Sequence, residues 1–469
     1  MRRLSCLALL VLALAVPAPA RAADEGVKSL SVTVYNQGRA LIGEVRSMEL
    51  PKGTGLVEFP GVPETIEAHT LRIASMTAPA DFTVLDMNYQ YDLVSVKNLL
   101  DRYVGRELTL VLPDFKDAKA REIRKAKLLA NNDLPVFQLD DGIYVGPYQA
   151  LLLPEVPKGL RPKPTLVWLV RNDGPARQDV EVSYLAGQIT WRADYVLTLN
   201  RANDQAQLAG WVTLANQSGM AFDKARLKLV AGDVRQAGLT ERRFLKSRAD
   251  VAMLGAAPQM QEEAFFEYHL YSLERPVSIA NRETKQISLL AAPKLGVKKE
   301  LVARFSDHHM GGGPDPIRQK VQVFLKFKNV KQNGLGLAMP KGVVRAYQES
   351  GDGSSLLIGE DSIEHTAKGE EVRLTMGEAF DVKIERRLAK AEKIGKTRFV
   401  LAWEIRVRNG KDKAQDLLLQ EHFPGAWKIV TASHEYKRLD ARTAQFALSV
   451  PPTGKGEEFL VTYEVEIEE

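Results

Sequence analysis

EFLVTYEVEIE, residues 458–468, alternates apolar and polar side chains, with Leu460 as the one exception. The apolar set is Phe459, Val461, Tyr463, Val465 and Ile467. Successive side chains of a β-strand point to opposite faces of a sheet, so a period of two predicts a strand with one buried and one wet face. Strands of this kind are typical of antiparallel sheets that pack on one side.

The same alternation recurs along the chain, in residues 195–199, 225–229, 321–327 and 399–407. Helical signals are few. One segment, SVKNLLDRYV (residues 95–104), has a serine suited to cap a helix start, apolar residues at helical spacing, and Gly105 after it. We therefore predict an all-β fold: two antiparallel sandwich-like halves, a small barrel-like insertion and one short helix.

Breaks in the alternation suggest the domain boundaries. We expect residues 23–92 with 159–235 to form an N-terminal sandwich, residues 93–158 an inserted barrel-like subdomain, residues 236–262 a flexible linker, and residues 263–469 a C-terminal sandwich. Inside the insertion, residues 118–130 are rich in Ala, Lys, Arg, Glu and Leu, which favour helices. Helix and broken strands are both consistent with that segment.

The N-terminus, MRRLSCLALLVLALAVPAPARA, has the features of a secretory signal peptide: a basic start, a short apolar run and small residues at its end. We predict that residues 1–22 are a signal peptide cleaved between Ala22 and Ala23; the alternative is a retained N-terminal anchor. Cys6 is the only cysteine, so cleavage leaves a cysteine-free mature chain. Neither disulfides nor a thiolate site are then expected.

Cleavage also removes three arginines and lowers the formal net charge from +5 to +2. A near-neutral surface of mixed sign lacks the basic stripe that nucleic acids require, so we expect no nucleic-acid partner. No second apolar stretch approaches the ~20 residues that span a bilayer, so we expect no transmembrane segment in the mature chain. The predicted location is the periplasm, or the outer envelope, of a bacterium with two membranes.

The chain has few residues suited to metal or nucleophilic chemistry, with 7 His and 1 Cys. The densest polar cluster lies in IGEDSIEHTAKGEE, residues 358–371, with Glu360, Asp361, His365 and Glu370 as candidates. Carboxylates beside a histidine can supply general acid–base chemistry. The alternative is a set of solvated turn residues, since Gly359 and Gly369 bracket the segment.

A second candidate is SDHHMGGGPDP, residues 306–316, with Asp307, His308, His309 and Asp315. Adjacent histidines on a strand point to opposite faces, so an exposed flexible loop is a better interpretation than a metal site. No motif predicts a cofactor, and we expect none.

Two aromatic segments are also candidates for ligand binding. AFFEYHLYSLERP, residues 264–276, would form a sugar-stacking platform if Phe266, Tyr268 and His269 lay open, but we expect Phe265, Phe266 and Tyr268 to be shared with the core. Trp191 and Arg192 pose the same choice between a ligand shelf and core packing, and core packing is again preferred.

Eight ordered segments together resemble an exported bacterial family, the domain of unknown function numbered 4139, with mucoidy-inhibitor-like relatives. They include VYNQGRALI (34–42), DMNYQYDLVSVKNLLDRYVG (86–105), PTLVWLVRND (164–173), ITWRADYVL (189–197) and the stretches 210–234, 265–290, 333–348 and 357–382. The resemblance implies a β-rich envelope protein and supplies no catalytic residue. Longer relatives carry a separate N-terminal domain and a coiled coil; we expect neither here, because Val27 begins the first predicted strand.

These observations favour an exported, non-catalytic binding or structural protein of the cell envelope. Its partner would be an envelope protein or a polysaccharide, and the sequence leaves the oligomeric state open. The alternative hypothesis is a hydrolase of an envelope polysaccharide or other envelope polymer that uses the cluster around Glu360.

Overall fold

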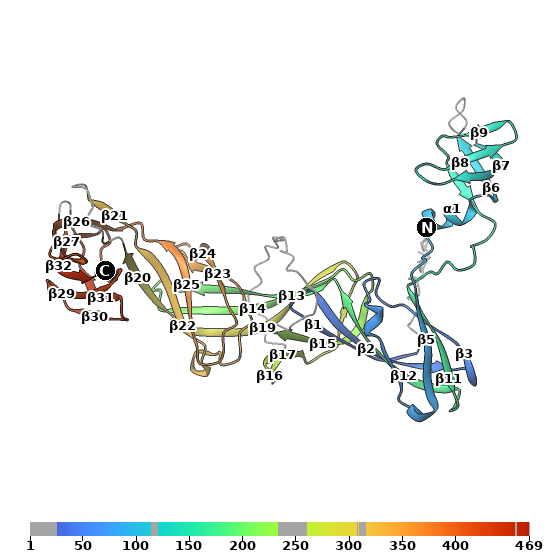
Figure 1. The fold of residues 1–469 in the computed structure, drawn as a ribbon, viewed down its shortest axis with the longest axis horizontal. Coiled ribbons are helices and arrows are strands. Elements are labelled where there is room, and N and C mark those ends of the chain that lie inside the picture. The colour runs from blue at the N-terminus through green and yellow to red at the C-terminus, as the bar shows by residue number, and fades with distance from the viewer. Residues whose placement is uncertain are drawn as a thin grey trace, which may run out of the picture. The chain divides into compact units, whose positions relative to one another are not determined.

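A computed structural model describes residues 26–113, 121–232, 260–306, 308, 316–454 and 457–468 (Figure 1). Strands dominate these residues, most of them paired antiparallel, which confirms the all-β prediction. One α-helix, α1 (Val96–Tyr103), accompanies them, with three short 3-10 turns at Ala68–Thr70, Pro79–Asp81 and Lys331–Asn333. No sheet of the described chain closes into a barrel.

The chain separates into two compact units, one of residues 1–31 with 42–185 and the other of residues 32–41 with 186–469. The division passes through β1 (Val27–Tyr35) and β2 (Arg39–Glu49). Strands of residues 189–231, which the sequence pattern grouped with the N-terminal sandwich, lie in the second unit.

The first unit holds two groups of paired strands besides the insertion. One group has β2, β12 and β4 as neighbours, and the other has the order β3, β11, β5. Their bounds are β3 (Gly53–Pro60), β4 (Arg72–Ser75), β5 (Phe82–Gln90), β11 (Thr165–Asn172) and β12 (Arg177–Gly187). Trp168 of β11 is fully buried and stacks on Phe59 of β3 at 5.1 Å between ring centroids.

The insertion is an open five-stranded antiparallel sheet in the order β10, β6, β7, β8, β9. Its strands are β6 (Glu107–Pro113), β7 (Arg121–Ala130), β8 (Val136–Leu139), β9 (Gly142–Tyr144) and β10 (Ala150–Leu152). Helix α1 buries Leu100 and Tyr103 in the same core. The helix begins as predicted, because the Ser95 side chain accepts a hydrogen bond from the Asn98 backbone N–H.

The sequence left open whether residues 118–130 form a helix or strands. Residues 121–130 form strand β7. Ala126 and Leu128 pair with neighbouring strands and are buried in the insertion's core. Cross-strand pairing and burial therefore outweigh the local helix propensity of this segment.

Three sheets and one smaller group make up the second unit. The group has the order β16, β17, β15, β1, with β18 also paired to β15. The first sheet has the order β19, β14, β13, β23, β24, and the second has the order β25, β22, β20, β28, β31, β30. The third sheet has the order β21, β26, β27, β32, β29. The bounds from β13 to β20 are β13 (Ile189–Leu199), β14 (Gln205–Asn216), β15 (Phe222–Ala231), β16 (Met260–Phe265), β17 (Tyr268–Leu273), β18 (Val277–Ile279), β19 (Glu283–Gly296) and β20 (Lys298–Phe305). The remaining strands are β21 (Ile317–Gln319), β22 (Gln322–Lys328), β23 (Gly342–Glu349), β24 (Ser355–Ile363), β25 (Glu371–Glu378), β26 (Val382–Lys393), β27 (Arg398–Asn409), β28 (Gln415–His422), β29 (Ala426–Ala432), β30 (Tyr436–Arg438), β31 (Thr443–Val450) and β32 (Phe459–Glu468).

Two of the strand pairs among the described residues are parallel, within sheets that are mostly antiparallel as predicted. β13 pairs with β23, and β20 pairs with β28. Each pair joins strands that are far apart in the sequence, and parallel neighbours need a long crossover connection, which alternation along a single strand does not reveal.

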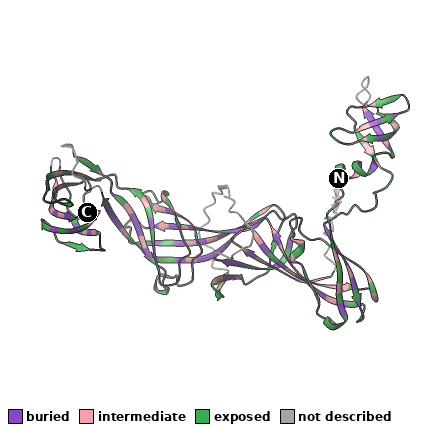
Figure 2. Cartoon of the chain, in the orientation of Figure 1, coloured by how far each residue is buried: buried purple, intermediate pink, exposed green. Residues whose placement is uncertain are grey.

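The two C-terminal sheets pack face to face around one apolar core, to which β32 contributes four buried side chains. Val461, Tyr463, Val465 and Ile467 are each at most 2 % exposed, while the residues between them are more accessible. Figure 2 shows how buried and exposed residues are distributed over the strands of the chain. The strand pairs on one side with β27 and on the other with β29. The predicted one-sided strand is confirmed.

Other predictions concern residues outside the described chain. The signal peptide and its cleavage site at Ala22 and Ala23 lie there, as does the predicted linker up to residue 259, whereas its last residues belong to β16. Among the described residues, no helix has both the length and the apolar character to cross a membrane.

Candidate functional site

A pocket of about 250 Å³ lies in the second unit where four distant segments meet. Its lining includes Glu267, His269 and Tyr271 near and on β17, Met339, and His365 with Thr366 after β24. We call it the histidine pocket. His365 belongs to the predicted polar cluster and His269 to the aromatic segment, so the fold brings together residues from two separate candidates.

Hydrogen bonds hold the walls of the histidine pocket in place. The Tyr271 hydroxyl donates to the Ala338 carbonyl at 2.9 Å, and burial raises the pKa of this phenol. Met339 and Thr366 exchange both backbone hydrogen bonds at 2.9 Å. The segment before β23 is therefore fixed to β17 on one side and to the 365–367 loop on the other.

Asn329, fully buried after the end of β22, clamps the two loops behind the pocket. Its Nδ2 donates to the carbonyls of Leu337 at 2.8 Å and Ala367 at 3.0 Å, and its Oδ1 accepts from the Gly336 N–H at 3.0 Å. A buried amide with its partners in place rigidifies its surroundings. The geometry of the pocket is thus set by groups outside its lining.

Each imidazole of the pocket is oriented by a different partner. His269 Nδ1 lies 2.6 Å from Glu262 Oε1, and His365 Nδ1 accepts from the Lys341 backbone N–H at 3.2 Å. A carboxylate only accepts, so Nδ1 of His269 carries a proton and Nε2 is an acceptor in the neutral ring. For His365 the neutral ring has its proton on Nε2, which makes it a donor. The two rings therefore differ in which nitrogen is the acceptor.

The hairpin between β16 and β17 places an exposed aromatic tip next to Glu267 and His269 of the pocket. Phe265 is 59 % and Phe266 is 83 % exposed, which corrects the expectation that both belong to the core. Both rings stand at the tip of the hairpin, where β16 ends at Phe265 and a two-residue loop follows. Phe266 lies 5.9 Å from the ring centroid of Tyr268, which is partly buried.

Phe266 also has an unusual backbone conformation, with φ at 56°. Positive φ at the first central residue of a two-residue hairpin loop is normally adopted by Gly, because a Cβ is unfavourable there. A bulky side chain in this region is an outlier that costs about 1–3 kcal/mol. The tip therefore carries a large exposed ring at a conformational cost.

The four predicted cluster residues do not share one partner. Glu360 lies 2.9 Å from Arg345 Nε, Asp361 accepts from the Thr375 N–H at 2.7 Å, and Glu370 accepts from the Ala367 N–H at 2.7 Å. Of the four, His365 is the one that lines the histidine pocket. Asp361 joins β24 to β25, and Glu370 closes a turn, so both have structural contacts.

The second candidate is only partly visible. Asp307, His309 and Asp315 lie outside the described chain, and His308 is 3 % exposed, which corrects the expectation of an exposed loop at this position. Its ring packs against Phe305, Trp403 and Phe423. Within the described ranges, no three His, Cys, Asp or Glu side chains are grouped as a metal site.

A buried ionic group lies beside His308 in the C-terminal core. Arg386 Nη2 and Nη1 donate to the Glu421 carboxylate at 2.5 and 3.1 Å, and the Tyr463 hydroxyl donates to it at 2.7 Å. His308 Nε2 is 3.4 Å from Glu421 Oε2. The Arg386, Glu421 and His308 side chains are 0 % exposed, so this group has no access for a ligand and serves the core.

Trp191 is buried, which confirms the expected core packing. Arg192 is exposed on the other face of β13 and its Nε lies 3.1 Å from Asp194 Oδ2. Asp194 also accepts from the Thr213 hydroxyl at 2.7 Å and lies 3.6 Å from Arg345. These contacts form a cross-strand ionic network on the sheet.

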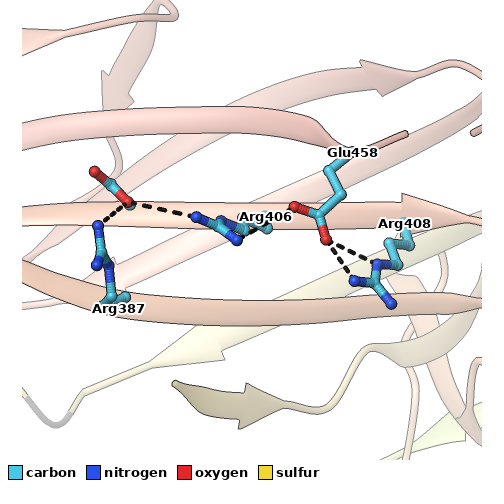
Figure 3. A network of polar contacts seen from close by, with 5 residues as sticks. Arg387, Arg406, Arg408 and Glu458 are labelled. Atoms are coloured by element: carbon cyan, nitrogen blue, oxygen red, sulfur yellow. Dashed lines mark hydrogen bonds and ion pairs between the residues drawn. The ribbon is translucent and has the colours of Figure 1, made fainter. Parts of the chain in front are cut away.

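A longer row of charges follows β27 on the outer face of its sheet (Figure 3). Glu404 lies 2.8 Å from Arg387 and 4.0 Å from Arg406, and Glu458 lies 3.6 Å from Arg406 and 2.5 Å from Arg408. The signs alternate, so neighbouring charges neutralise one another. Exposed pairs of this kind typically contribute about 0–1 kcal/mol each. Three arginines and two glutamates leave the row with a net charge of +1, which is far from the stripe of like charges that marks a polymer-binding surface.

The histidine pocket lies within the part of the chain that matches a known family model. That model is described as a domain of unknown function (DUF4139) and matches residues 180–430. The comparison with curated proteins found no match. Because the family model covers more than half of the 469 residues, the chain belongs to the DUF4139 family.

Proposed function

We propose that this protein is an exported, non-catalytic component of the bacterial cell envelope that binds a polysaccharide at the histidine pocket. The observation that carries the proposal is Phe266, an exposed ring held at a positive φ next to the pocket. Strained residues that persist in a fold are concentrated at functional sites. If the turn served folding alone, glycine at position 266 would cost less conformational free energy than phenylalanine.

The chemistry of the site fits a sugar. An exposed aromatic ring can stack on the C–H face of a pyranose, while Nε2 of the neutral His269 ring offers an acceptor for hydroxyl groups. The volume of about 250 Å³ is below the ~300–1,000 Å³ range of pockets that enclose drug-sized ligands. The pocket therefore suits a single sugar unit, with the rest of the polymer lying on the surface outside it.

Export is supported by the sequence features of residues 1–22, and the cysteine-free mature chain is compatible with an oxidising compartment. The binding role is supported over catalysis by the contacts of the predicted acids. Asp361 and Glu370 accept from backbone amides, and Glu360 pairs with Arg345. The hydrolase alternative is retained as an outcome of the test below.

The test compares Phe266→Gly with Phe380→Gly, a matched change at a residue that is 86 % exposed. The mature chain and both variants are bound to the protease-treated carbohydrate fraction of a bacterial envelope extract, and bound sugar is identified. We expect Phe266→Gly to weaken binding about tenfold or more, the effect of a typical interface anchor. Its melting temperature should be unchanged or higher, because the strain at residue 266 is removed.

Equal binding by the wild type and Phe266→Gly would contradict the proposal. Polysaccharide that shortens during incubation with the wild type, and does not shorten with His365→Gln, would overturn the non-catalytic role and favour the hydrolase.

A further inference from the structure

A second pocket, of about 430 Å³, lies in the second unit between β20 and β21. It is separate from the histidine pocket and shares no described lining residue with it. Its lining includes Arg304 and Phe305 from β20, Ile317, Arg318 and Gln319 from β21, and Lys320. We call it the basic pocket.

Three cations and no carboxylate occur among the described residues that line the basic pocket. Lys320 lies 2.7 Å from Glu378, and Arg318 lies 3.7 Å from Glu385. Arg304 instead donates from Nε to the neutral side-chain amide of Gln420 at 3.0 Å. In the described part of the chain Arg304 thus has no recorded carboxylate partner, and its charge is available to an anion.

A further guanidinium lies close to Arg304. The Arg373 Cζ is 3.7 Å and the Arg304 Cζ is 5.5 Å from the centroid of the Phe324 ring. Burial, and after it the nearby charge of Arg304, lower the pKa of Arg373. Two like charges this close favour the approach of a negative group.

Gln319 provides an independent observation. Both polar atoms of its side-chain amide are buried, and neither has a hydrogen-bond partner among the described residues. Burying an amide without partners costs free energy, so such groups in native folds call for an explanation. A ligand in the pocket would supply the missing partners once the Gln319 side chain turned its amide toward the pocket.

We propose that the basic pocket binds an anionic sugar unit, one that bears a carboxylate or a phosphate. The negative group pairs with Arg304 and Lys320, and the sugar hydroxyls both donate to and accept from the Gln319 amide. Ile317, which is 37 % exposed, offers an apolar surface to the sugar ring. A bare inorganic anion has no C–H face to place against Ile317, so a sugar-bearing ligand fits better.

The test measures binding of four probes to the mature chain by isothermal titration calorimetry: trigalacturonate, glucose 6-phosphate, maltotriose and inorganic phosphate. We expect at least one anionic sugar to bind, more weakly at high salt, and maltotriose and inorganic phosphate to bind at least tenfold more weakly. Arg304→Gln should reduce affinity tenfold or more, while Arg442→Gln, an exposed arginine on a different loop, should leave it unchanged.

Gln319→Leu separates binding from folding. Replacing an unpartnered amide by an apolar group of similar size should raise the melting temperature, whereas affinity for the anionic sugar should fall. The proposal is overturned if neither anionic sugar binds, or if maltotriose or inorganic phosphate binds as tightly as the anionic sugar. It is also overturned if Arg304→Gln and Gln319→Leu keep full affinity. Phe266→Gly should not change this binding, so failure of the proposed function and failure of this site give different results.

Discussion

Four fully buried asparagines lie at or just after the ends of strands: Asn172, Asn216, Asn329 and Asn409. In each case Nδ2 donates to loop carbonyls and Oδ1 accepts a backbone N–H. Three of the four accept from the residue two positions further on, which is the pattern of an Asx turn. One residue type thus serves the same purpose in several sheets.

Asn409 provides a prediction at this scale. Its Nδ2 donates to Lys413 and Val450 carbonyls at 2.9 Å each. Asn409→Ala leaves buried groups without partners, so the free energy of unfolding should fall by at least about 2 kcal/mol in urea denaturation. Asn333→Ala, which removes one exposed hydrogen bond to the Lys328 carbonyl, should cost less than about 1 kcal/mol. An equal decrease in the free energy of unfolding for the two variants would contradict the proposed contribution of the Asn409 hydrogen bonds.

At the scale of elements, β32 is the strand whose removal should matter most. Its four inward side chains, Val461, Tyr463, Val465 and Ile467, contribute ~1.5–3 kcal/mol each before entropy is counted. That sum is comparable with the ~5–15 kcal/mol stability of a domain. Removing residues 457–469 also separates β27 from β29, so we expect no soluble protein.

The matched control changes the outer face of β32. Glu464→Gln with Glu466→Gln should shift the melting temperature little, because Glu466 pairs with Arg398 at an exposed position and exposed pairs are weak. Soluble truncated protein with an unchanged melting temperature would show that β32 packs on nothing.

Elements with strong local signals could be predicted from the sequence, and those that depend on distant partners could not. The alternation of residues 458–468 identified β32, and Ser95 identified the start of α1. The helix propensity of β7 was misleading because its partners in β6 and β8 decide its conformation. The parallel β13–β23 pair has no local signature at all.

The same distinction applies to the candidate site. His365 was identified from its polar neighbours and His269 from an aromatic segment, but their shared pocket depends on contacts between segments about 100 residues apart. Phe266 was expected in the core because aromatic residues are usually buried there. Only the position of the turn shows that it is exposed. Asn329 and Gln319 lacked any sequence signal that distinguishes them from surface amides.

At the scale of the whole molecule, buried tyrosines predict alkaline sensitivity. Burial raises the pKa of Tyr184, Tyr195, Tyr271 and Tyr463 well above the ordinary value of 10.0. A phenol with a raised pKa in the folded state contributes stability that is fully present below pH 10. The contribution is lost as the pH rises from 10 toward the folded-state pKa, because the unfolded chain ionises first.

We therefore expect the free energy of unfolding to be unaffected by these groups up to about pH 10 and to fall steadily above it. Absorbance at 295 nm reports tyrosinate. The part of its rise that comes from these four buried tyrosines should be late and should coincide with the change in tryptophan fluorescence that accompanies unfolding. Full ionisation of all 13 tyrosines in a chain that still melts cooperatively would contradict this prediction.

The parallel pairing of β13 with β23 has a consequence for the time course of biosynthesis. Roughly 140 residues separate the two strands, and ribosomes add about 5–20 residues per second, so β13 spends roughly 7–30 s without this partner. An unpaired strand edge is a template for aggregation during that interval. We therefore expect the edge of β13 that β14 does not cover to need protection from other chains until residues 342–349 have been made.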